Sequence, residues 1–334
     1  MAQEKLTQPE NPLTTLSEHL TEDMRQVNSA ILNHMQSDVA LIPQLASYLI
    51  AAGGKRIRPL LTLAATAIHA GNMSRAHGLA ASVEFIHTAT LLHDDVVDES
   101  DQRRGQDSAN LIFGNQASVL VGDFLFSRAF QLMTADGNLE ILKILSSASA
   151  VISEGEVMQL TTANNIDTTF DEYLEVIKAK TAALFAAATE IGPVIAGADK
   201  AQQQAMHDYG MYLGIAFQIA DDALDYAADQ ATLGKTIGDD FREGKMTLPV
   251  ILAIQNASEE EREFWQRTLG NKDQTEDDLA HAQSLIAKHD CITKTLNTAR
   301  EYGRKAQEAL NTTPSHELRT LLHALIPYTI ERKI

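Results

Sequence analysis

Two copies of one acidic motif, D-D-x-x-D, are the clearest chemical signal in the sequence. On a helix, the first and last aspartates of such a motif are i, i+4 neighbours, so their carboxylates share one face. Carboxylates this close repel one another, and a hard divalent cation such as Mg²⁺ relieves the repulsion while leaving positions for water and phosphate oxygens. The two copies therefore predict metal ligands, namely Asp94, Asp95, Asp98, Asp221, Asp222 and Asp225.

Each motif on its own could be a solvated acidic face of a helix. Both copies, however, lie within apolar sequence, LLHDDVV and FQIADDALDY. Charged residues are almost never buried without a partner, so we expect the aspartates to line one shared cavity that contains cations. Arg103 and Arg104 follow the first motif after a short loop. Guanidinium groups bind phosphate in a bidentate manner, so the same cavity suits a phosphorylated ligand.

Helices are expected to position these residues. The chain has 334 residues, of which 44% are hydrophobic, and its long segments repeat apolar residues with a helical period. We predict an all-α fold and a single domain over residues 1–334, with residues 1–13 flexible. A chain of this length can bury a core large enough for such a domain.

The helix that carries the first acidic motif is predicted to begin near Ser74. On it, His87 shares one stripe with Asp94 and Asp98. A lone histidine on an apolar stripe is usually a core residue, but this one lies two turns from the carboxylates on the same side. Further helices are predicted over residues 15–35 and 39–52, in two helices from 105 to 162, from 170, over 201–229, and as three or four amphipathic helices beyond 249.

Composition excludes several classes of protein. A formal net charge of −18 argues against a nucleic-acid partner, because nothing offsets repulsion from the phosphate backbone. The single cysteine, Cys291, rules out an internal disulfide framework and fits a reducing compartment. The polar N-terminus is no signal peptide, and no uninterrupted apolar run reaches the ~20 residues that span a bilayer. We expect a protein without a transmembrane segment.

Three further motifs accompany the aspartates, namely GGKRIRP upstream and GKT and GKMTLP downstream. Together with both D-D-x-x-D motifs, they make the chain resemble the trans-polyprenyl diphosphate synthases, and among them the bacterial octaprenyl diphosphate synthases. The resemblance covers nearly the whole chain from Leu16. It implies a helical bundle of the isoprenoid synthase type with a central apolar cavity. It also implies a cytoplasmic homodimer that makes quinone side chains, with release of the product by transient membrane contact left open.

The GGKRIRP motif is the candidate site for one diphosphate. Its glycines let backbone amides approach a phosphate, while Lys55 and Arg58 supply charge. The alternative is a solvated loop. The resemblance implies that this lysine and arginine, with His87 and Arg104, bind isopentenyl diphosphate. Arg56 is a secondary candidate.

A second diphosphate requires cations of its own. Lys180 and Thr181 lie among alanines in KAKTAALF, and a lysine and a hydroxyl in so apolar a context suit a diphosphate. The resemblance assigns this pair to the allylic substrate. Gln218 is i, i+4 to Asp222 and hence near the predicted metal face. Further ligands of this diphosphate are expected to be Arg103, Lys235 and Lys245.

The implied reaction joins isopentenyl diphosphate head to tail onto an allylic primer, which we expect to be farnesyl diphosphate. About two to three Mg²⁺ ions would assist departure of pyrophosphate, and the cations would stabilise it. The double bond of isopentenyl diphosphate then attacks the allylic cation, and the released pyrophosphate is the proton acceptor proposed for the family. Apolar walls would exclude water. The predicted catalytic residues are Asp94, Asp95, Asp98, Arg103, Lys180, Asp221 and Lys235.

Product length is predicted from residues beside the first motif. Thr90 and Ala89 lie four and five residues before Asp94, where the growing tail must pass. Both are small, whereas short-chain relatives carry bulky aromatics at one or both positions. Burying each CH₂ is worth ~0.8 kcal/mol, so elongation should continue to about eight isoprene units, until a deeper side chain stops it. Met133 or Phe130 is the candidate floor, although core packing would select the same residues.

Several other functions were weighed. A shorter-chain synthase making geranylgeranyl or farnesyl diphosphate is the nearest, and the small Ala89 and Thr90 oppose it. A terpene cyclase does not need the GGKRIRP cluster, and non-catalytic subunits of heteromeric synthases typically lose one acidic motif. The simplest alternative is a helical scaffold that binds calcium and has no catalytic role. A nucleotide-binding P-loop is excluded because its first glycine would fall at Asp229 and no strand precedes it.

Overall fold

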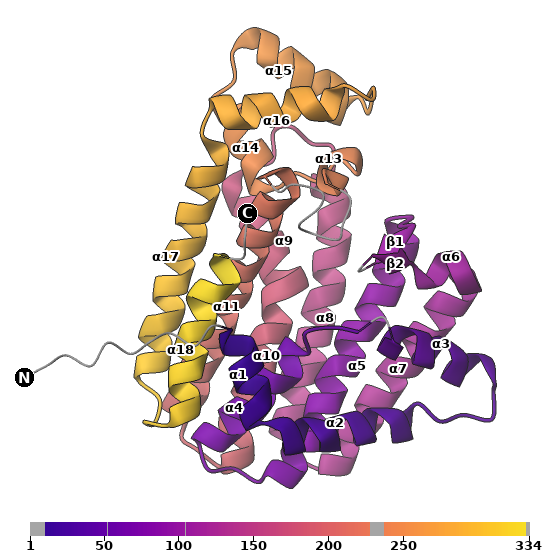
Figure 1. Cartoon of the computed structure of the whole chain (residues 1–334), viewed down its shortest axis with the longest axis vertical. Coiled ribbons are helices and arrows are strands. Elements are labelled where there is room, and N and C mark those ends of the chain that lie inside the picture. Colours follow the sequence, from indigo (N-terminus) through magenta and orange to yellow (C-terminus); the bar gives the residue numbers. More distant parts are fainter. Residues whose placement is uncertain (1–10, 52, 104, 228–236, 332–334) are drawn as a thin grey trace, which may run out of the picture.

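The computed structural model is helical apart from its loops and one short hairpin in the residues that it describes, and this confirms the predicted all-α class (Figure 1). The hairpin pairs β1 (Gln102–Arg103) with β2 (Gln106–Asp107) in antiparallel fashion. The described residues are 11–51, 53–103, 105–227 and 237–331.

Four N-terminal helices lie in the lower half of Figure 1. The helix predicted over residues 15–35 is in fact two helices, because Leu20 leaves helical geometry with φ −108° and ψ 18°. Most of the segment predicted to be flexible, residues 1–10, lies outside the described residues. The four helices are α1 (Pro12–His19), α2 (Thr21–His34), α3 (Leu41–Ala51) and α4 (Ile57–Ile68).

Helix α5 (Met73–Val97) carries the first acidic motif in its last turn. It begins one residue before the predicted start, because the side chain of Asn72 caps it by accepting a hydrogen bond from the Ser74 amide at 3.0 Å. It ends where Asp98 becomes its C-cap. Along its length α5 packs against α7 (Asn115–Asp136), to which the five-residue α6 (Ala109–Phe113) leads.

A central helical run contains the KAKT sequence. It consists of α9 (Phe170–Ile177), η1 (Lys178–Ala182) and α10 (Ala183–Ala196). The middle segment, η1, is π-helical, and such wider turns are frequent at functional sites. The whole run is apolar and long enough to cross a membrane, but 83% of its most apolar window is buried inside the protein. It is therefore a core helix of this fold.

Two long helices hold the KAKT segment between them. Helix α8 (Leu139–Thr162) packs against η1 closely, since a Cβ added at Gly155 would lie 2.7 Å from the Cβ of Ala179. Helix α11 (Lys200–Ala227) packs on both η1 and α10 and carries the second acidic motif near its end. The tight contact at Gly155 fixes the position of η1 along the axis of α8.

The C-terminal part begins with α13 (Asp239–Arg242), a single turn after the second motif. Beyond it the described residues form five α-helices where three or four were predicted, because turns divide the long polar stretch. Of these, α14 to α16 form the upper end of the molecule in Figure 1, and α17 runs down beside α11. The five are α14 (Leu248–Gln255), α15 (Glu259–Trp265, continued by the π-helical η2, Gln266–Gly270), α16 (Asp278–Lys288), α17 (Cys291–Asn311) and α18 (Glu317–Ile330).

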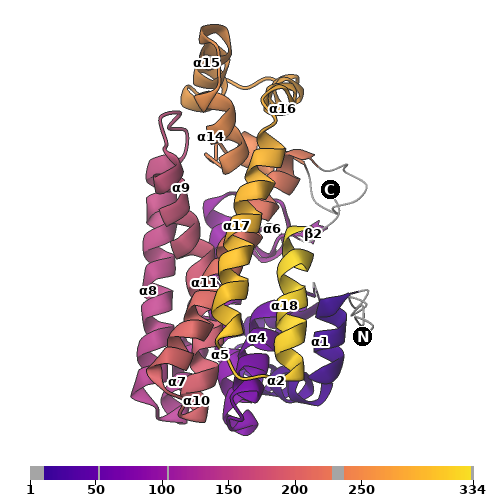
Figure 2. The same cartoon turned by 90° about the vertical axis from the view of Figure 1, so that its left-hand side faces the viewer.

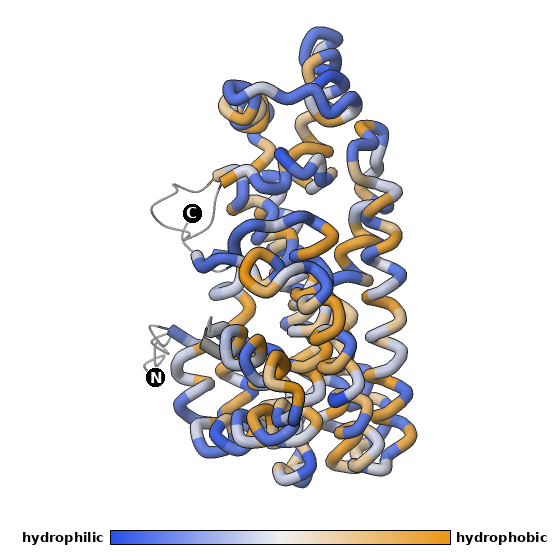
Figure 3. The backbone as a smooth tube through the Cα atoms, turned by 90° about the vertical axis from the view of Figure 1, so that its right-hand side faces the viewer, coloured by the Kyte–Doolittle hydropathy of each residue, from blue (hydrophilic) through white to orange (hydrophobic). Residues whose placement is uncertain are grey.

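The long helices α8, α11 and α17 run nearly parallel, as Figure 2 shows. Polar and apolar residues alternate along the tube in Figure 3, as expected for helices that each bury one stripe. One cluster of buried apolar side chains contains members from Leu13 to Ile330. The first and last helices thus share a single core with the helices that carry the acidic motifs.

Candidate active site

The first acidic motif presents two carboxylates to a shared space. Asp94 and Asp98 lie one turn apart at the end of α5, where the Asp98 amide donates to the Asp94 carbonyl at 2.8 Å. Their side chains are only 14% and 17% exposed. The helical spacing therefore brings both carboxylates to one face, as the sequence predicted, and it does so in a largely buried position.

Two lysines from distant elements stand between the acidic motifs. The Nζ of Lys180, in η1, lies 3.9 Å from Oδ2 of Asp94 and 2.7 Å from Oε2 of Glu156 on α8. The Nζ of Lys245 lies 3.0 Å from Oδ2 of Asp98. The cations expected for a diphosphate thus lie at the first motif, paired with carboxylates.

Lys245 also reaches the second motif through the backbone. Its amide donates to the carbonyl of Asp240 at 2.8 Å. The amide of Asp240 donates in turn to Oδ2 of Asp225 at 3.1 Å. The short helix α13 therefore ties Lys245 to α11, and Lys245 links the two aspartate clusters.

Asp222 of the second motif is held by two side chains. The hydroxyl of Tyr173 donates to its Oδ2 at 2.6 Å, and Nε2 of Gln218 donates to its Oδ1 at 2.7 Å. The other end of Gln218 accepts a hydrogen bond from Oγ1 of Thr181 at 2.8 Å. Three predicted site residues, Thr181, Gln218 and Asp222, are thus joined in one network.

A cavity opens among these side chains. It encloses about 610 Å³ of space including its open mouth, and its walls include Tyr173, Lys180, Thr181, Gln218, Asp222 and Lys245. Five of these six were predicted from the sequence. Tyr173 was not singled out, since a tyrosine in an apolar stretch is indistinguishable from a core residue before its partner is known.

Burial and mutual repulsion raise the pKa values of the acidic groups. Burial raises the pKa of Asp94 to about 7, although Lys180 opposes the shift. Burial likewise raises the pKa of Asp222 to about 7. The pKa of Asp240 is well above its usual range, first because of burial and then because of Asp225. Burial therefore disfavours the charged form of all three carboxylates.

The pKa of Lys245 is raised despite its burial. Burial alone would lower it, but Asp98, Asp240 and Glu243 surround the ammonium group and outweigh that effect. Lys245 is therefore held firmly in its charged form. Among the residues that the structure describes, no three His, Cys, Asp or Glu side chains converge closely enough to hold a metal ion.

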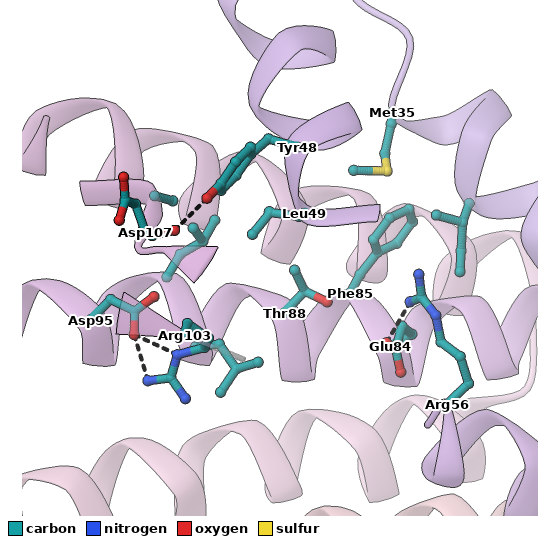
Figure 4. Close-up of a pocket in the computed structure, with 14 residues that line it drawn as sticks. Met35, Tyr48, Leu49, Arg56, Glu84, Phe85, Thr88, Asp95, Arg103 and Asp107 are labelled. Carbon is teal, nitrogen blue, oxygen red and sulfur yellow. Dashed lines mark hydrogen bonds and ion pairs between the residues drawn. The ribbon is translucent and has the colours of Figure 1, made fainter. Parts of the chain in front are cut away.

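Asp95 faces a different part of the molecule. Nε of Arg103 donates to Oδ1 of Asp95 at 2.6 Å, and Nη2 lies 2.5 Å from the same oxygen. Both residues line a second cavity (Figure 4). At the other end of that cavity, Arg56 donates to Glu84 at 2.5 Å. Thr88 and Phe85 of α5 lie between the two ion pairs in Figure 4. The structure thus pairs Asp95 with Arg103, whose charge also acts on Asp94.

The GGKRIRP motif spans the turn before α4 and the first residues of that helix. Arg56 caps this helix in a left-handed conformation, φ 47°, and its charge is matched by Glu84. The guanidinium of Arg58 lies 4.4 Å from the centre of the Phe185 ring. Lys55 is exposed, and His87 is half-buried on α5. Two predicted ligands, Arg104 and Lys235, lie outside the described residues.

The residues predicted to set product length are mostly interior. Ala89 and Met133 are 0% and 1% exposed, and the hydroxyl of Thr90 donates to the carbonyl of His87 at 2.8 Å. Neither described cavity has any of the three predicted residues in its wall. Phe130 is 44% exposed on α7, so of the two candidate floor residues only Met133 faces the interior.

The sequence and the fold of this chain are similar to those of known proteins. The family model described as polyprenyl synthetase matches residues 39–286. The octaprenyl diphosphate synthase of Escherichia coli is 45% identical over 96% of this chain and 99% of its own. A crystal structure of a decaprenyl diphosphate synthase from Rhodobacter capsulatus superposes with a TM-score of 0.92 at 54% identity, covering 96% of this chain and 99% of that one. A polyprenyl synthase from Caulobacter crescentus, complexed with calcium and isoprenyl diphosphate, superposes with a TM-score of 0.94 at 50% identity, covering 98% and 99%.

Proposed function

The chain belongs to the polyprenyl synthetase family, and from this premise we propose that it is a long-chain trans-polyprenyl diphosphate synthase. Such a prenyltransferase adds isopentenyl diphosphate head to tail to an allylic diphosphate. The octaprenyl and decaprenyl synthases among its relatives support a long product over the shorter-chain alternative.

One observation carries the proposal. Lys180 and Lys245 lie 3.9 Å from Asp94 and 3.0 Å from Asp98 of the first motif, and they line one cavity with Asp222 of the second. Carboxylates alone would repel a diphosphate, and lysines alone would not bind a divalent cation. A site that holds both side by side suits a metal–diphosphate complex, because each half of the ligand finds the opposite charge.

Polyprenyl synthases use a divalent metal ion, and we propose Mg²⁺ here, with about two to three ions. The donor set fits it. Asp94 and Asp98 of the first motif, and Asp221 and Asp222 of the second, supply the hard carboxylate oxygens that Mg²⁺ prefers. Burial, more than neighbouring charge, raises the pKa values of Asp94 and Asp222, and a bound divalent cation would favour their charged forms. When bound, the metal supplies Lewis-acid assistance to the departing pyrophosphate.

The chain's own cations bind and stabilise the leaving group. As the carbon–oxygen bond of the allylic diphosphate breaks, its electron pair and negative charge pass to pyrophosphate, close to Lys180 and Lys245. The double bond of isopentenyl diphosphate then forms the new carbon–carbon bond to the allylic cation. Loss of one proton to pyrophosphate restores a double bond. Thr181 and Gln218 orient the allylic half through their hydrogen bond.

The second diphosphate is assigned to the turn before α4. We propose that Lys55, Arg58 and His87 bind isopentenyl diphosphate, with Arg104 as a further ligand. The contact between Arg58 and the Phe185 ring supports this assignment, because it holds the guanidinium on the side of α10 that continues η1. Lys235 is assigned to the allylic diphosphate, and Asp95 and Asp225 to the metal site, on the same resemblance.

The proposal also covers the primer, the product and the compartment in which the product is made. We propose farnesyl diphosphate as primer and an octaprenyl diphosphate product that supplies quinone side chains in the cytoplasm. Ala89 and Thr90 are the proposed chain-length residues and Met133 the proposed floor. The single cluster of buried residues supports one catalytic domain.

We also propose that the protein is a homodimer. Large apolar side chains remain exposed along three neighbouring helices, α6, α7 and α8, and a second copy would cover them. They are Leu111, Ile112, Val119, Leu120, Phe130, Val151, Val157 and Leu160.

Incubation of the purified protein alone with farnesyl diphosphate, labelled isopentenyl diphosphate and Mg²⁺ tests the proposal. Chromatography should show an octaprenyl product, and a chelator should abolish its formation. A geranylgeranyl product would favour the shorter-chain alternative. Absence of any product, with activity restored by a second polypeptide, would identify a non-catalytic subunit instead.

A further inference from the structure

The hydroxyl of Tyr173 makes a hydrogen bond that the reaction described above does not use. Tyr173 lies in α9 and is 3% exposed, and its hydroxyl lies 2.6 Å from Oδ2 of Asp222, which is 4% exposed. A hydrogen bond to a buried carboxylate is stronger than one between neutral groups. Its donor therefore has a large influence on how the carboxylate is oriented.

This hydrogen bond is the first of three in a row. The other oxygen of Asp222 accepts from Nε2 of Gln218 at 2.7 Å. With its NH₂ group committed in this way, Gln218 must turn its carbonyl oxygen toward Thr181, whose hydroxyl donates to it at 2.8 Å. The order of donors and acceptors is therefore fixed along all three hydrogen bonds, from Tyr173 to Thr181.

The three hydrogen bonds connect three separate elements. Tyr173 belongs to α9, Asp222 and Gln218 to α11, and Thr181 to the π-helical η1, and these elements pack against one another. Tyr173, Gln218 and Thr181 also line the cavity that contains Lys180 and Lys245. A change in the orientation of Asp222 would therefore reach the groups assigned to the allylic diphosphate.

We propose that Tyr173 is a positioning residue for the allylic diphosphate, acting through Asp222 and Gln218 on the hydroxyl of Thr181. This inference rests on the proposed function. Without the Tyr173 hydroxyl, one oxygen of a buried carboxylate loses its donor, and Asp222 can rotate toward another partner. Gln218 then loses its fixed orientation, and the Thr181 hydroxyl is no longer held in one direction.

The test is Tyr173→Phe, which removes one oxygen and keeps the ring. We expect kcat/KM for the allylic substrate to fall about tenfold or more, as for the loss of one hydrogen bond to a charged group. KM for isopentenyl diphosphate should change by less than about twofold. Calorimetric binding of an unreactive allylic thiolodiphosphate with Mg²⁺ should weaken by a similar factor, which provides a readout independent of turnover.

Tyr209→Phe is the matched control. Tyr209 is equally buried, but its hydroxyl donates to the carbonyl of Leu322 at 3.1 Å, away from the cavity. The control should leave both kinetic constants and analogue binding unchanged, even if its thermal midpoint falls. Equal kinetic losses in both variants would mean that any buried tyrosine hydroxyl matters only for stability, and this would overturn the inference.

A double-mutant cycle with Thr181→Val separates a relay from two independent effects. If Tyr173 acts through the network, the double variant should lose far less than the product of the two single losses. A loss in the double variant equal to the product of the two single losses would contradict the inference, and so would a Tyr173→Phe enzyme with unchanged analogue binding. Wild-type protein that makes no prenyl product would instead contradict the proposed function, so the two failures are distinguishable.

Discussion

Lys245 and Asp98 are 147 residues apart in the sequence, yet their side chains form an ion pair of 3.0 Å between Nζ and Oδ2. The same lysine is tied through Asp240 to Asp225 of the second motif. Its position thus depends on α5, α11 and α13 together. Loss of this one charge should affect the site more than loss of any surface lysine.

Lys245→Met should reduce kcat about a hundredfold or more, since a buried cation aimed at the departing pyrophosphate is lost. It also leaves Asp98 and Asp240 without their shared counter-charge. Steady-state kinetics with saturating Mg²⁺ measures the effect. Lys200→Met is the control, because Lys200 is 78% exposed and pairs with Glu140 far from the cavity. That control should change kcat by less than about twofold, and a similar loss in both variants would contradict the role of Lys245.

Ala89→Tyr should shorten the product. Ala89 is fully buried on α5, one turn before the acidic motif, and an aromatic ring there would occupy the proposed path of the growing tail. Overpacking should lower the free energy of unfolding by about 1–3 kcal/mol, so the thermal midpoint is measured beside the product profile. Chromatography should then show shorter prenyl chains, whereas Ala89→Ser should keep the wild-type length. A folded tyrosine variant with unchanged product would refute the tunnel assignment.

Gly155→Ala should disturb Lys180 without touching its side chain. A Cβ at Gly155 would lie 2.7 Å from Ala179 Cβ and 2.9 Å from the Lys180 amide, so α8 and η1 must move apart. We expect a loss of about 1–3 kcal/mol in the free energy of unfolding, together with a lower kcat.

Gly78→Ala is the control for that substitution. It lies inside α5, and its added Cβ would meet Leu132 at an ordinary 3.7 Å. It should leave activity intact and stabilise the protein by about 0.5–1 kcal/mol, as expected when alanine replaces glycine within a helix. Urea unfolding followed by circular dichroism compares the two variants.

Stability should depend on pH through His207 and Glu190, whose Nδ1 and Oε2 lie 2.9 Å apart. Chiefly through this hydrogen bond, folding raises the pKa of His207. The stabilisation is therefore complete below the pKa of an unfolded histidine and is lost as pH rises through the raised value. Glu190→Gln should lower the urea midpoint more at pH 6 than at pH 9.

The exposed pair of Arg304 and Glu308 provides the comparison. Glu308→Gln should lower the midpoint little and equally at the two pH values, since exposed ion pairs contribute little. A pH-independent effect of Glu190→Gln would show that the hydrogen bond to His207 does not control its titration.

Much of the fold could be predicted because its signals are local. The periodicity and the Asn72 cap place α5 within one residue of its predicted start, and Phe170 begins α9 as expected. The break at Leu20 was missed, since the apolar stripe continues through it and only the backbone angles reveal the turn.

The site was less predictable wherever a partner decides the role of a residue. Spacing brought Asp94 and Asp98 to one face, but it could not show that Asp95 pairs with Arg103 on another. The contact of Glu156 with Lys180 is likewise tertiary, and no spacing in the sequence indicates it. Tyr173 has no local signal at all, because its partner lies 49 residues away.

The wider turn at η1 sets the rotational phase between the two segments that it joins. A π-helical turn holds about one residue more than an α-helical turn, so the same sequence wound as an ordinary helix would rotate everything before η1 by roughly 100° relative to α10. Tyr173 would then turn away from Asp222 and lose its hydrogen bond to it. The count of residues in this single turn, more than their chemical character, sets the phase between the two ends of the hydrogen-bonded relay.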